Sequence, residues 1–165
     1  MDALELDESR PAKTGGSSPR LAEMGALGIL LRKARRSLVE QMDAKLKPFG
    51  ITYSLYAAIA CLSRSGAMQP VVLARELVID AGALTRCLDR AVAMGLVCRE
   101  YTPHDRRSVI VSLSAEGQQL VASLQDVLSE VLDANLVGIS SNEIQGMLDL
   151  MGRIVANGKN KLTCD

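Results

Sequence analysis

The chain of 165 residues is poor in aromatic side chains, with no Trp, one Phe and three Tyr. Hydrophobic residues nevertheless make up 48% of it, so Leu, Val, Ala, Ile and Met must fill the core. Most of these residues are good helix formers. The composition therefore favours one largely α-helical domain with a terminal extension over a β-sandwich.

Long apolar runs and a net charge are also missing. No apolar stretch approaches the roughly 20 residues that cross a bilayer, and the acidic start MDALELDESRP lacks the apolar segment of a signal peptide. We therefore expect a cytoplasmic protein without a membrane partner.

The formal net charge is zero, but residues 20–64 carry eight Lys and Arg against three Asp and Glu. Phosphate attraction follows the local field, so the neutral total does not exclude DNA binding.

Residues that carry chemistry are scarce. His104 is the only histidine, and no second ligand stands at metal spacing from it, so we expect no metal or other cofactor. The sequence has neither a Gly-rich phosphate loop nor a nucleophile elbow, which argues against an enzyme. The four cysteines show no C-x-x-C spacing and are expected to be reduced thiols.

The first part of the chain predicts two helices. Apolar residues recur at three- and four-residue steps from Leu21, which is the stripe of an amphipathic helix, and Pro48 with Gly50 ends it. Thr52 is a good N-cap for a second helix, which stops at Gly66. Residues 1–20, rich in Ser, Gly, Pro and acidic side chains, are predicted to be a disordered tail.

The last part of the chain predicts two more helices. Ser114 can cap a long helix that continues to about Leu136. Ser140 and Glu143 form a capping box for the final helix, which we expect to end before Gly158 and a tail of residues 159–165. The first helix and these two carry more apolar surface than one small domain can cover. We therefore expect them to pair with a second copy of the chain.

A helix-turn-helix pattern lies between these flanking helices. Pro70 suits the first turn of a short helix, Asp80 is a natural N-cap for the next one, and Gly95 supplies a left-handed C-terminal cap. The inner face of the second helix is expected to carry Leu84, Leu88, Ala91 and Val92. Its opposite face carries Gly82, Thr85, Arg86, Asp89, Arg90 and Ala93. This opposite face could enter a major groove and offer a donor fork to guanine or phosphate, or be a solvated polar surface.

Residues 95–117, GLVCREYTPHDRRSVIVSLSAEG, predict two strands joined by a short basic loop. Val109, Val111 and Leu113 share one face, as the period of two requires. A planar, weakly hydrated arginine at the loop tip would fit a narrow minor groove. Phosphates would repel Asp105, so it is expected either to pair with a nearby arginine and brace the loop or simply to form the turn.

The order of these elements resembles the MarR family of bacterial transcription regulators over about residues 21–158. The strings that carry the resemblance are ITYSLYAAIACL, LTRCLDRAVAMGLVCRE and HDRRSVIVSLSAEG. The resemblance implies a mainly α fold with a small β-hairpin wing. It also implies a homodimer in which two winged helix-turn-helix regions, residues 51–114, read a pseudo-palindromic double-stranded DNA operator. Residues 21–50 and 115–158 would be the dimerisation helices.

The resemblance also assigns roles to single residues. Thr85 and Arg86 fall on the recognition helix, Arg107 matches the wing arginine that enters the minor groove, Arg106 would contact the backbone, and Asp105 would brace the wing. The predicted DNA-binding residues are Gly82, Thr85, Arg86, Arg90, Arg106 and Arg107.

Two modes of regulation remain open at this point. Many members of the family are repressors released by a small phenolic or aromatic-carboxylate ligand bound between dimer helices and DNA-binding lobe. In this chain, parts of the first helix, the second helix and the long helix capped by Ser114 would line that region. Tyr53 and Tyr56 are the candidate ligand contacts there, or else packed core residues. Other members sense oxidants through a cysteine near the start of the first helix, and this chain has none there. Cys61, Cys87 and Cys98 are expected to be buried inert thiols, and if redox sensing occurs Cys87 matters most. Cys164 is in the predicted tail. A third hypothesis is a winged protein-interaction module without a specific DNA site.

Overall fold

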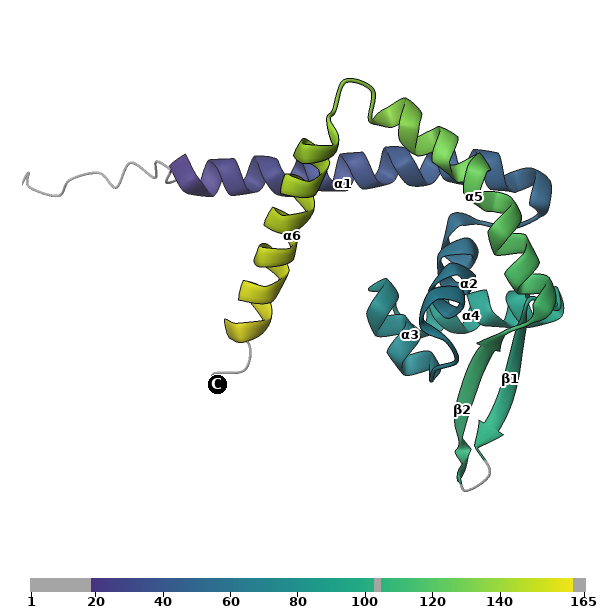
Figure 1. Ribbon diagram of the computed structural model, residues 1–165. Helices are drawn as coiled ribbons and strands as arrows, with labels where there is room; N and C mark the ends of the chain where they lie inside the picture. The colour runs from purple at the N-terminus through teal and green to yellow at the C-terminus, as the bar shows by residue number, and fades with distance from the viewer. Residues whose placement is uncertain (1–18, 103–104, 162–165) are drawn as a thin grey trace, which may run out of the picture. The chain divides into compact units, whose positions relative to one another are not determined.

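The structure, a computed structural model, describes the backbone of residues 19–102 and 105–161, and the side chains of residues 22–101 and 109–158. The chain divides into two compact units, Met1–Ser37 and Leu38–Asp165. The elements follow in the order α1 (Pro19–Leu46), η1 (Lys47–Phe49), α2 (Tyr53–Ser65), α3 (Pro70–Leu77), α4 (Ala81–Ala93), β1 (Val97–Thr102), β2 (Asp105–Leu113), α5 (Ala115–Asn135) and α6 (Ser141–Lys161) (Figure 1). The prediction of a mainly helical fold with a small hairpin is confirmed.

The described part of the first unit is the N-terminal portion of α1. It leaves several large apolar side chains exposed, and Leu30 is the most open of them at 63%. The others are Met24, Ile29 and Leu31.

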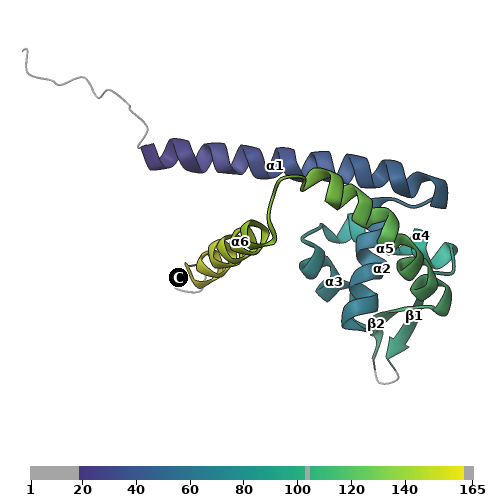
Figure 2. The ribbon, with the colours of Figure 1, turned by 45° about the horizontal axis from the view of Figure 1, so that its top comes forward.

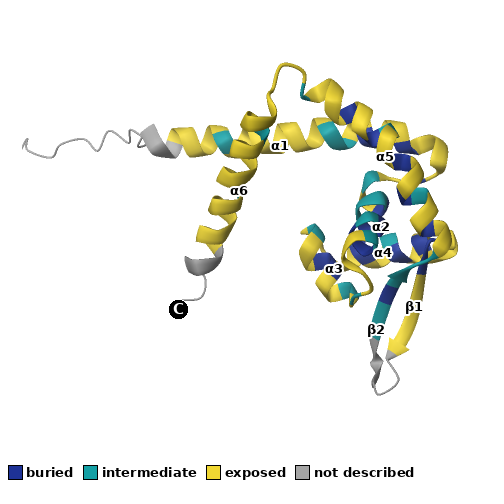
Figure 3. Ribbon diagram, viewed as in Figure 1, coloured by how far each residue is buried: buried dark blue, intermediate teal, exposed yellow. Residues whose placement is uncertain are grey.

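The core of the second unit is built from aliphatic side chains of the end of α1, of α2 to α5, and of the hairpin (Figure 3). Its largest fully buried side chains are Leu46, Leu55, Ile59, Leu73, Leu84, Leu88, Val111 and Leu124. Among the described residues, no polar or charged side chain is buried with them. Burial of apolar surface is therefore what holds α4 and the hairpin in place.

The predicted helix caps are confirmed. The Thr52 hydroxyl accepts a hydrogen bond from the Leu55 amide at 3.3 Å, and the Ser114 hydroxyl accepts one from the Gly117 amide at 2.9 Å. At α6, the Glu143 carboxylate accepts from the Ser140 amide at 2.8 Å and the Ser140 hydroxyl accepts from the Glu143 amide at 3.3 Å, the reciprocal pattern of a capping box. The hydrogen bonds from Ser140 lower the pKa of the Glu143 carboxyl.

The hairpin is an antiparallel pair in which Val97 faces Leu113, Arg99 faces Val111 and Tyr101 faces Val109. A short backbone bridge adds Met68 to the far side of β2, with two hydrogen bonds of 3.1 and 2.9 Å to Val111. The predicted strands are confirmed. The bridge from the α2–α3 connection was not predicted, because nothing in local spacing indicates it.

Two expectations about helices were wrong. Val92 is 38% exposed rather than part of the inner face of α4. Steps of four residues advance 40° around a helix, so Val92 lies about 80° from Leu84, whereas Ala91 stays aligned with it. The last helix does not end before Gly158 but runs to Lys161, since Gly158 does not adopt the left-handed conformation that terminates helices.

The start of α5 packs closely on the chain that links α4 to the wing. Gly117 is buried, and a Cβ added there would come within 2.6 Å of a Leu113 methyl carbon and would also collide with the Leu96 carbonyl oxygen.

We predict that Gly117→Ala lowers the free energy of unfolding by about 2–3 kcal/mol, since overpacking against backbone cannot relax. Urea denaturation measures this change in the free energy of unfolding. Gln119→Ala, exposed two residues later, is the control and should change stability by less than about 0.5 kcal/mol. Equal stability of the two variants would contradict the close contact.

Val78, which follows α3, adopts a left-handed backbone conformation with φ 53° and ψ 48°. It is 89% exposed, so its side chain has almost no packing to lose. Left-handed geometry strains a β-branched residue but not glycine. We predict that Val78→Gly raises the free energy of unfolding by about 1 kcal/mol, measured as a shift of the thermal midpoint.

The matched control is Val71→Gly, which removes an exposed isopropyl group from a right-handed position in α3. Because glycine is a poor helix former, this control should destabilise the protein slightly. A loss of stability in both variants would show that Val78 is not strained.

Candidate nucleic-acid interface

Helices α3 and α4 form a tight helix-turn-helix beside α2 (Figures 1 and 2). Pro70 occupies the first turn of α3, where its missing amide is not needed. The turn closes with a hydrogen bond of 3.1 Å from the Ile79 amide to the Ala74 carbonyl, and the Asp80 carboxylate caps α4 by accepting from the Ala83 amide at 2.8 Å. The backbone of this motif therefore fixes the direction in which α4 leaves the turn.

The N-terminal half of α4 presents an exposed face. Gly82, Thr85 and Arg86 all lie on it. The Thr85 hydroxyl donates to the Ala81 carbonyl at 2.8 Å, so its proton is engaged within the helix. Arg86 forms no hydrogen bond or ion pair with another described residue. Its guanidinium donors are thus available to an external acceptor.

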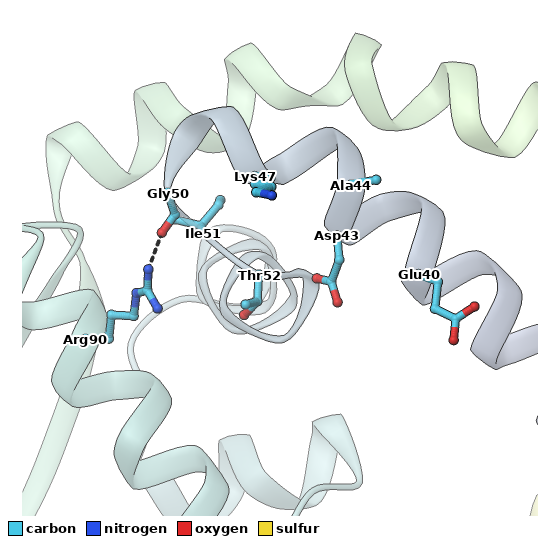
Figure 4. Close-up of a pocket in the computed structure, with 8 residues that line it drawn as sticks. All are labelled: Glu40, Asp43, Ala44, Lys47, Gly50, Ile51, Thr52 and Arg90. Atoms are coloured by element: carbon cyan, nitrogen blue, oxygen red, sulfur yellow. Dashed lines mark hydrogen bonds between the residues drawn. The ribbon is translucent and has the colours of Figure 1, made fainter.

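The C-terminal half of α4 is engaged on two sides. Arg90 donates from Nη2 to the Gly50 carbonyl at 2.5 Å, across an open cavity of about 500 Å³ that it shares with Glu40, Asp43 and Lys47 (Figure 4). Asp89 forms an ion pair of 2.7 Å with Arg99 of β1.

The wing residues are placed only in part. The backbone of β2 begins at Asp105, which pairs with Thr102 across the hairpin. The side chains of Asp105, Arg106 and Arg107 lie outside the described residues, as does all of His104. The roles assigned to these side chains therefore stay predictions.

Tyr53 and Tyr56 lie together at a second cavity of about 420 Å³. Their ring centroids are 6.5 Å apart with an interplanar angle of 31°, and both rings also pack against the core. Burial, and to a lesser degree Tyr53, raises the pKa of the Tyr56 hydroxyl, so this group keeps its proton at neutral pH. Met42 of α1 and residues of α5 complete the cavity, so it is lined by the three helices that the resemblance implied. The α5 residues are Gln125, Asp126, Leu128, Ser129 and Leu132.

The thiols differ in their surroundings. Cys61 is buried, and Cys87 is half-buried with its Sγ 3.7 Å from the Ser54 carbonyl. Burial raises the pKa of the Cys87 thiol, although Arg90 partly offsets this effect. Cys98 is exposed, which corrects the expectation that it is buried: its side chain lies on the hairpin face opposite Val97 and Arg99, because neighbours along a strand alternate. Cys164 lies outside the described residues.

Several contacts join residues that lie far apart in the sequence, and the sequence did not predict them. The Asp43 carboxylate accepts a hydrogen bond from the Tyr53 amide at 2.5 Å and so adds a second cap to α2. Lys45 pairs with Glu130 at 2.9 Å, and the amides of Gln41 and Asn135 bond to each other. These contacts tie the end of α1 to α5 and α2, and no local spacing indicates them.

The MarR family model matches residues 51–109. The multiple antibiotic resistance protein MarR of Escherichia coli K12 is 27% identical over 134 residues, which cover 81% of this chain and 93% of that protein. The organic hydroperoxide resistance transcriptional regulator of Bacillus subtilis 168 is 30% identical over 106 residues, covering 64% and 72%.

The chain belongs to the MarR family. Members of this family are transcription regulators that bind DNA rather than enzymes, and some of them are regulated by ligands. In the part of the chain that the structure describes, no helix has both the length and the apolar character to cross a membrane.

Solved structures agree with the fold. A mutant MarR from E. coli complexed with operator DNA superposes with a TM-score of 0.72 at 25% identity, covering 83% of this chain and 99% of that one. The regulator BldR from Sulfolobus solfataricus gives a TM-score of 0.77 at 23% identity, with 85% and 99% covered, and supports the fold alone. The winged helix-turn-helix architecture of this MarR-family chain is thereby confirmed.

The raised pKa of Cys87 predicts that its thiol reacts slowly with alkylating reagents. A smaller thiolate fraction at neutral pH and a half-buried sulfur both slow alkylation, so iodoacetamide should modify Cys98 well before Cys87 in the native protein. Peptide mass spectrometry over time measures the two rates, with Cys98→Ser as the control for assignment. Faster labelling of Cys87 at neutral pH would contradict the burial of its thiol.

Proposed function

We propose that this MarR-family chain acts in the cytoplasm as a homodimeric repressor that binds a pseudo-palindromic operator and is released by a small aromatic ligand. The observation that carries the DNA-binding part is the exposed face of α4, where the guanidinium of Arg86 has no partner among the described residues. Unpaired donors on a recognition helix are what a base edge or phosphate requires.

The proposed dimer rests on apolar surface that the chain does not cover itself. Large hydrophobic side chains are exposed on α1, on the α5–α6 connection and on α6 (Figure 3). They are Met24, Ile29, Leu30 and Leu31, then Val137 and Ile139, then Met147, Leu148, Leu150, Ile154 and Val155. Apolar surface of this extent favours association with a second copy. A two-fold dimer would place its recognition helices about 34–36 Å apart, one turn of DNA.

The proposed DNA contacts divide between two grooves. The small residue Gly82 would let α4 approach the major groove, where Thr85 and Arg86 would meet base edges or phosphates. On the wing, Arg107 would enter the minor groove and Arg106 would contact the backbone, while Asp105 would hold the shape of the loop. The wing assignments rest on the family resemblance and on the backbone course of β1 and β2.

The proposed ligand site is the cavity at Tyr53 and Tyr56. Its volume of about 420 Å³ lies in the range of small-molecule sites. The protonated Tyr56 hydroxyl can donate to an oxygen, and Asp126 in the lining favours a ligand that can donate in return. A phenol or hydroxylated aromatic acid has this chemistry. The fold neighbour BpsR of Bordetella bronchiseptica has its DNA binding regulated by 6-hydroxynicotinic acid, a molecule of that class.

The alternative of redox control through Cys87 has less support. A raised thiol pKa lowers the thiolate population that oxidants attack. A winged interaction module without a DNA site remains distinguishable by experiment, because it would bind operator and scrambled DNA equally.

Replacement of the groove-facing arginines tests the proposed contacts. We predict that Arg86→Ala and Arg107→Ala each weaken operator binding by about 1–3 kcal/mol while the dimer stays folded. Fluorescence anisotropy on the DNA beside the chain's own gene, at matched salt, measures the loss.

Arg153→Ala, an exposed position on α6, is the matched control and should bind like the wild type. Unchanged affinity of both test variants for the operator, or an equal loss of affinity for scrambled DNA, would contradict the proposed DNA contacts of Arg86 and Arg107.

A further inference from the structure

Helix α4 has two halves that differ in what their charged side chains touch. In the first half Arg86 has no partner among the described residues, whereas in the second half Asp89 and Arg90 are both bound to other elements. Arg90 follows Arg86 by four residues and lies only about 40° around the helix from it. Position on the helix alone therefore predicts the same role for both arginines. Their contacts within the protein, however, are different.

Arg90 is bound to the backbone that connects α1 to α2. Its Nη2 donates to the Gly50 carbonyl at 2.5 Å, and Figure 4 shows the side chain extended from α4 toward that oxygen. A hydrogen bond from a charged guanidinium to a carbonyl is stronger than a neutral one. Arg90 is exposed, but its guanidinium is thus directed toward a fixed acceptor of the protein itself.

The acceptor sits at a well-defined point. Gly50 has a φ of 70°, which ends the short η1 helix, and its amide donates to the Lys47 carbonyl at 3.0 Å. The next residue, Ile51, is buried, and Tyr53 is held by the carboxylate of Asp43. Because the connection is secured on both sides of Gly50, its carbonyl can serve as an anchor.

A second contact holds α4 from the direction of the wing. Asp89, the neighbour of Arg90, forms the 2.7 Å ion pair with Arg99 of β1. Both partners are partly exposed, so this pair alone contributes little to stability. Together the two contacts attach the same turn of α4 to two different parts of the fold, the α1–α2 connection and the hairpin.

We propose that Arg90 is a positioning residue that fixes the recognition helix against the Gly50 carbonyl, with the Asp89–Arg99 pair assisting it, and that it does not contact DNA phosphate. This assignment rests on the proposed operator binding and replaces the prediction that Arg90 is a DNA contact. Arg86 and Arg90 thus divide the helix into a part that meets DNA and a part that is anchored.

The salt dependence of operator binding separates the two roles. Each phosphate contact contributes about 0.9 to the slope of log K against log salt concentration. Arg90→Ala should weaken operator binding about two- to tenfold, the equivalent of one hydrogen bond, without changing this slope. Arg86→Ala is the matched comparison, in which loss of a DNA-facing charge should flatten the slope. A slope that flattens for Arg90→Ala by the amount of a phosphate contact would overturn the proposal, and so would unchanged affinity.

Hydrogen exchange of the free protein supplies a readout that needs no DNA. The amides of Met94, Gly95 and Leu96 close the end of α4 by bonding to carbonyls of residues 90–92. Arg90→Ala should speed exchange there and at the α1–α2 connection, whereas Arg86→Ala should not. Arg90→Lys retains a donor and should restore protection, which also covers the case in which the alanine variant folds poorly. Unaltered exchange in Arg90→Ala would contradict the anchor.

Failure of the proposed function would look different. If wild-type protein did not prefer its operator over scrambled DNA, the operator assignment would fall, while the exchange comparison would still decide whether Arg90 anchors α4.

Discussion

The junction where α4, β1 and α5 meet is the constraint on which the DNA-binding region depends. The Ser114 amide donates to the Leu96 carbonyl at 3.0 Å, and its hydroxyl donates to the Gly95 carbonyl at 2.6 Å while also capping α5. Gly117 lets α5 approach the same carbonyl of Leu96. Recognition helix, wing and long helix are therefore joined through one short stretch of backbone, and a displacement of any one of them must move the others.

Two kinds of contact set the position of α4, apolar packing and directional polar contacts. Burial of Leu84, Leu88 and Ala91 fixes which face of the helix points inward, although apolar packing by itself tolerates small rotations. Directional contacts from Asp89 and Arg90 then narrow that freedom at the C-terminal half. The N-terminal half is left with Thr85 and Arg86 exposed. Such an arrangement suits a helix that must hold a few donors in a groove within tight tolerance.

The sequence predicted what short-range chemistry determines. The caps at Thr52, Asp80 and Ser114 and the left-handed Gly95 all follow from patterns within four residues, and the structure confirms each of them. Contacts across the fold were beyond such patterns. Arg90 and Gly50 are 40 residues apart, so the anchored role of this arginine could not be seen from a helical wheel. For the ligand cavity, the family resemblance implied the two tyrosines and a contribution from the helix that is α5, whereas the individual α5 residues that line the cavity were not identified from the sequence.

A footprint of the protein on the DNA beside its own gene tests the central claim, a two-fold reader of an operator, most directly. Hydroxyl-radical cleavage at saturating protein should reveal two protected half-sites whose centres are about 10–10.5 base pairs apart, with protection related by a two-fold axis. Protection of one isolated half-site, or uniform protection that scrambled competitor DNA removes equally well, would contradict it.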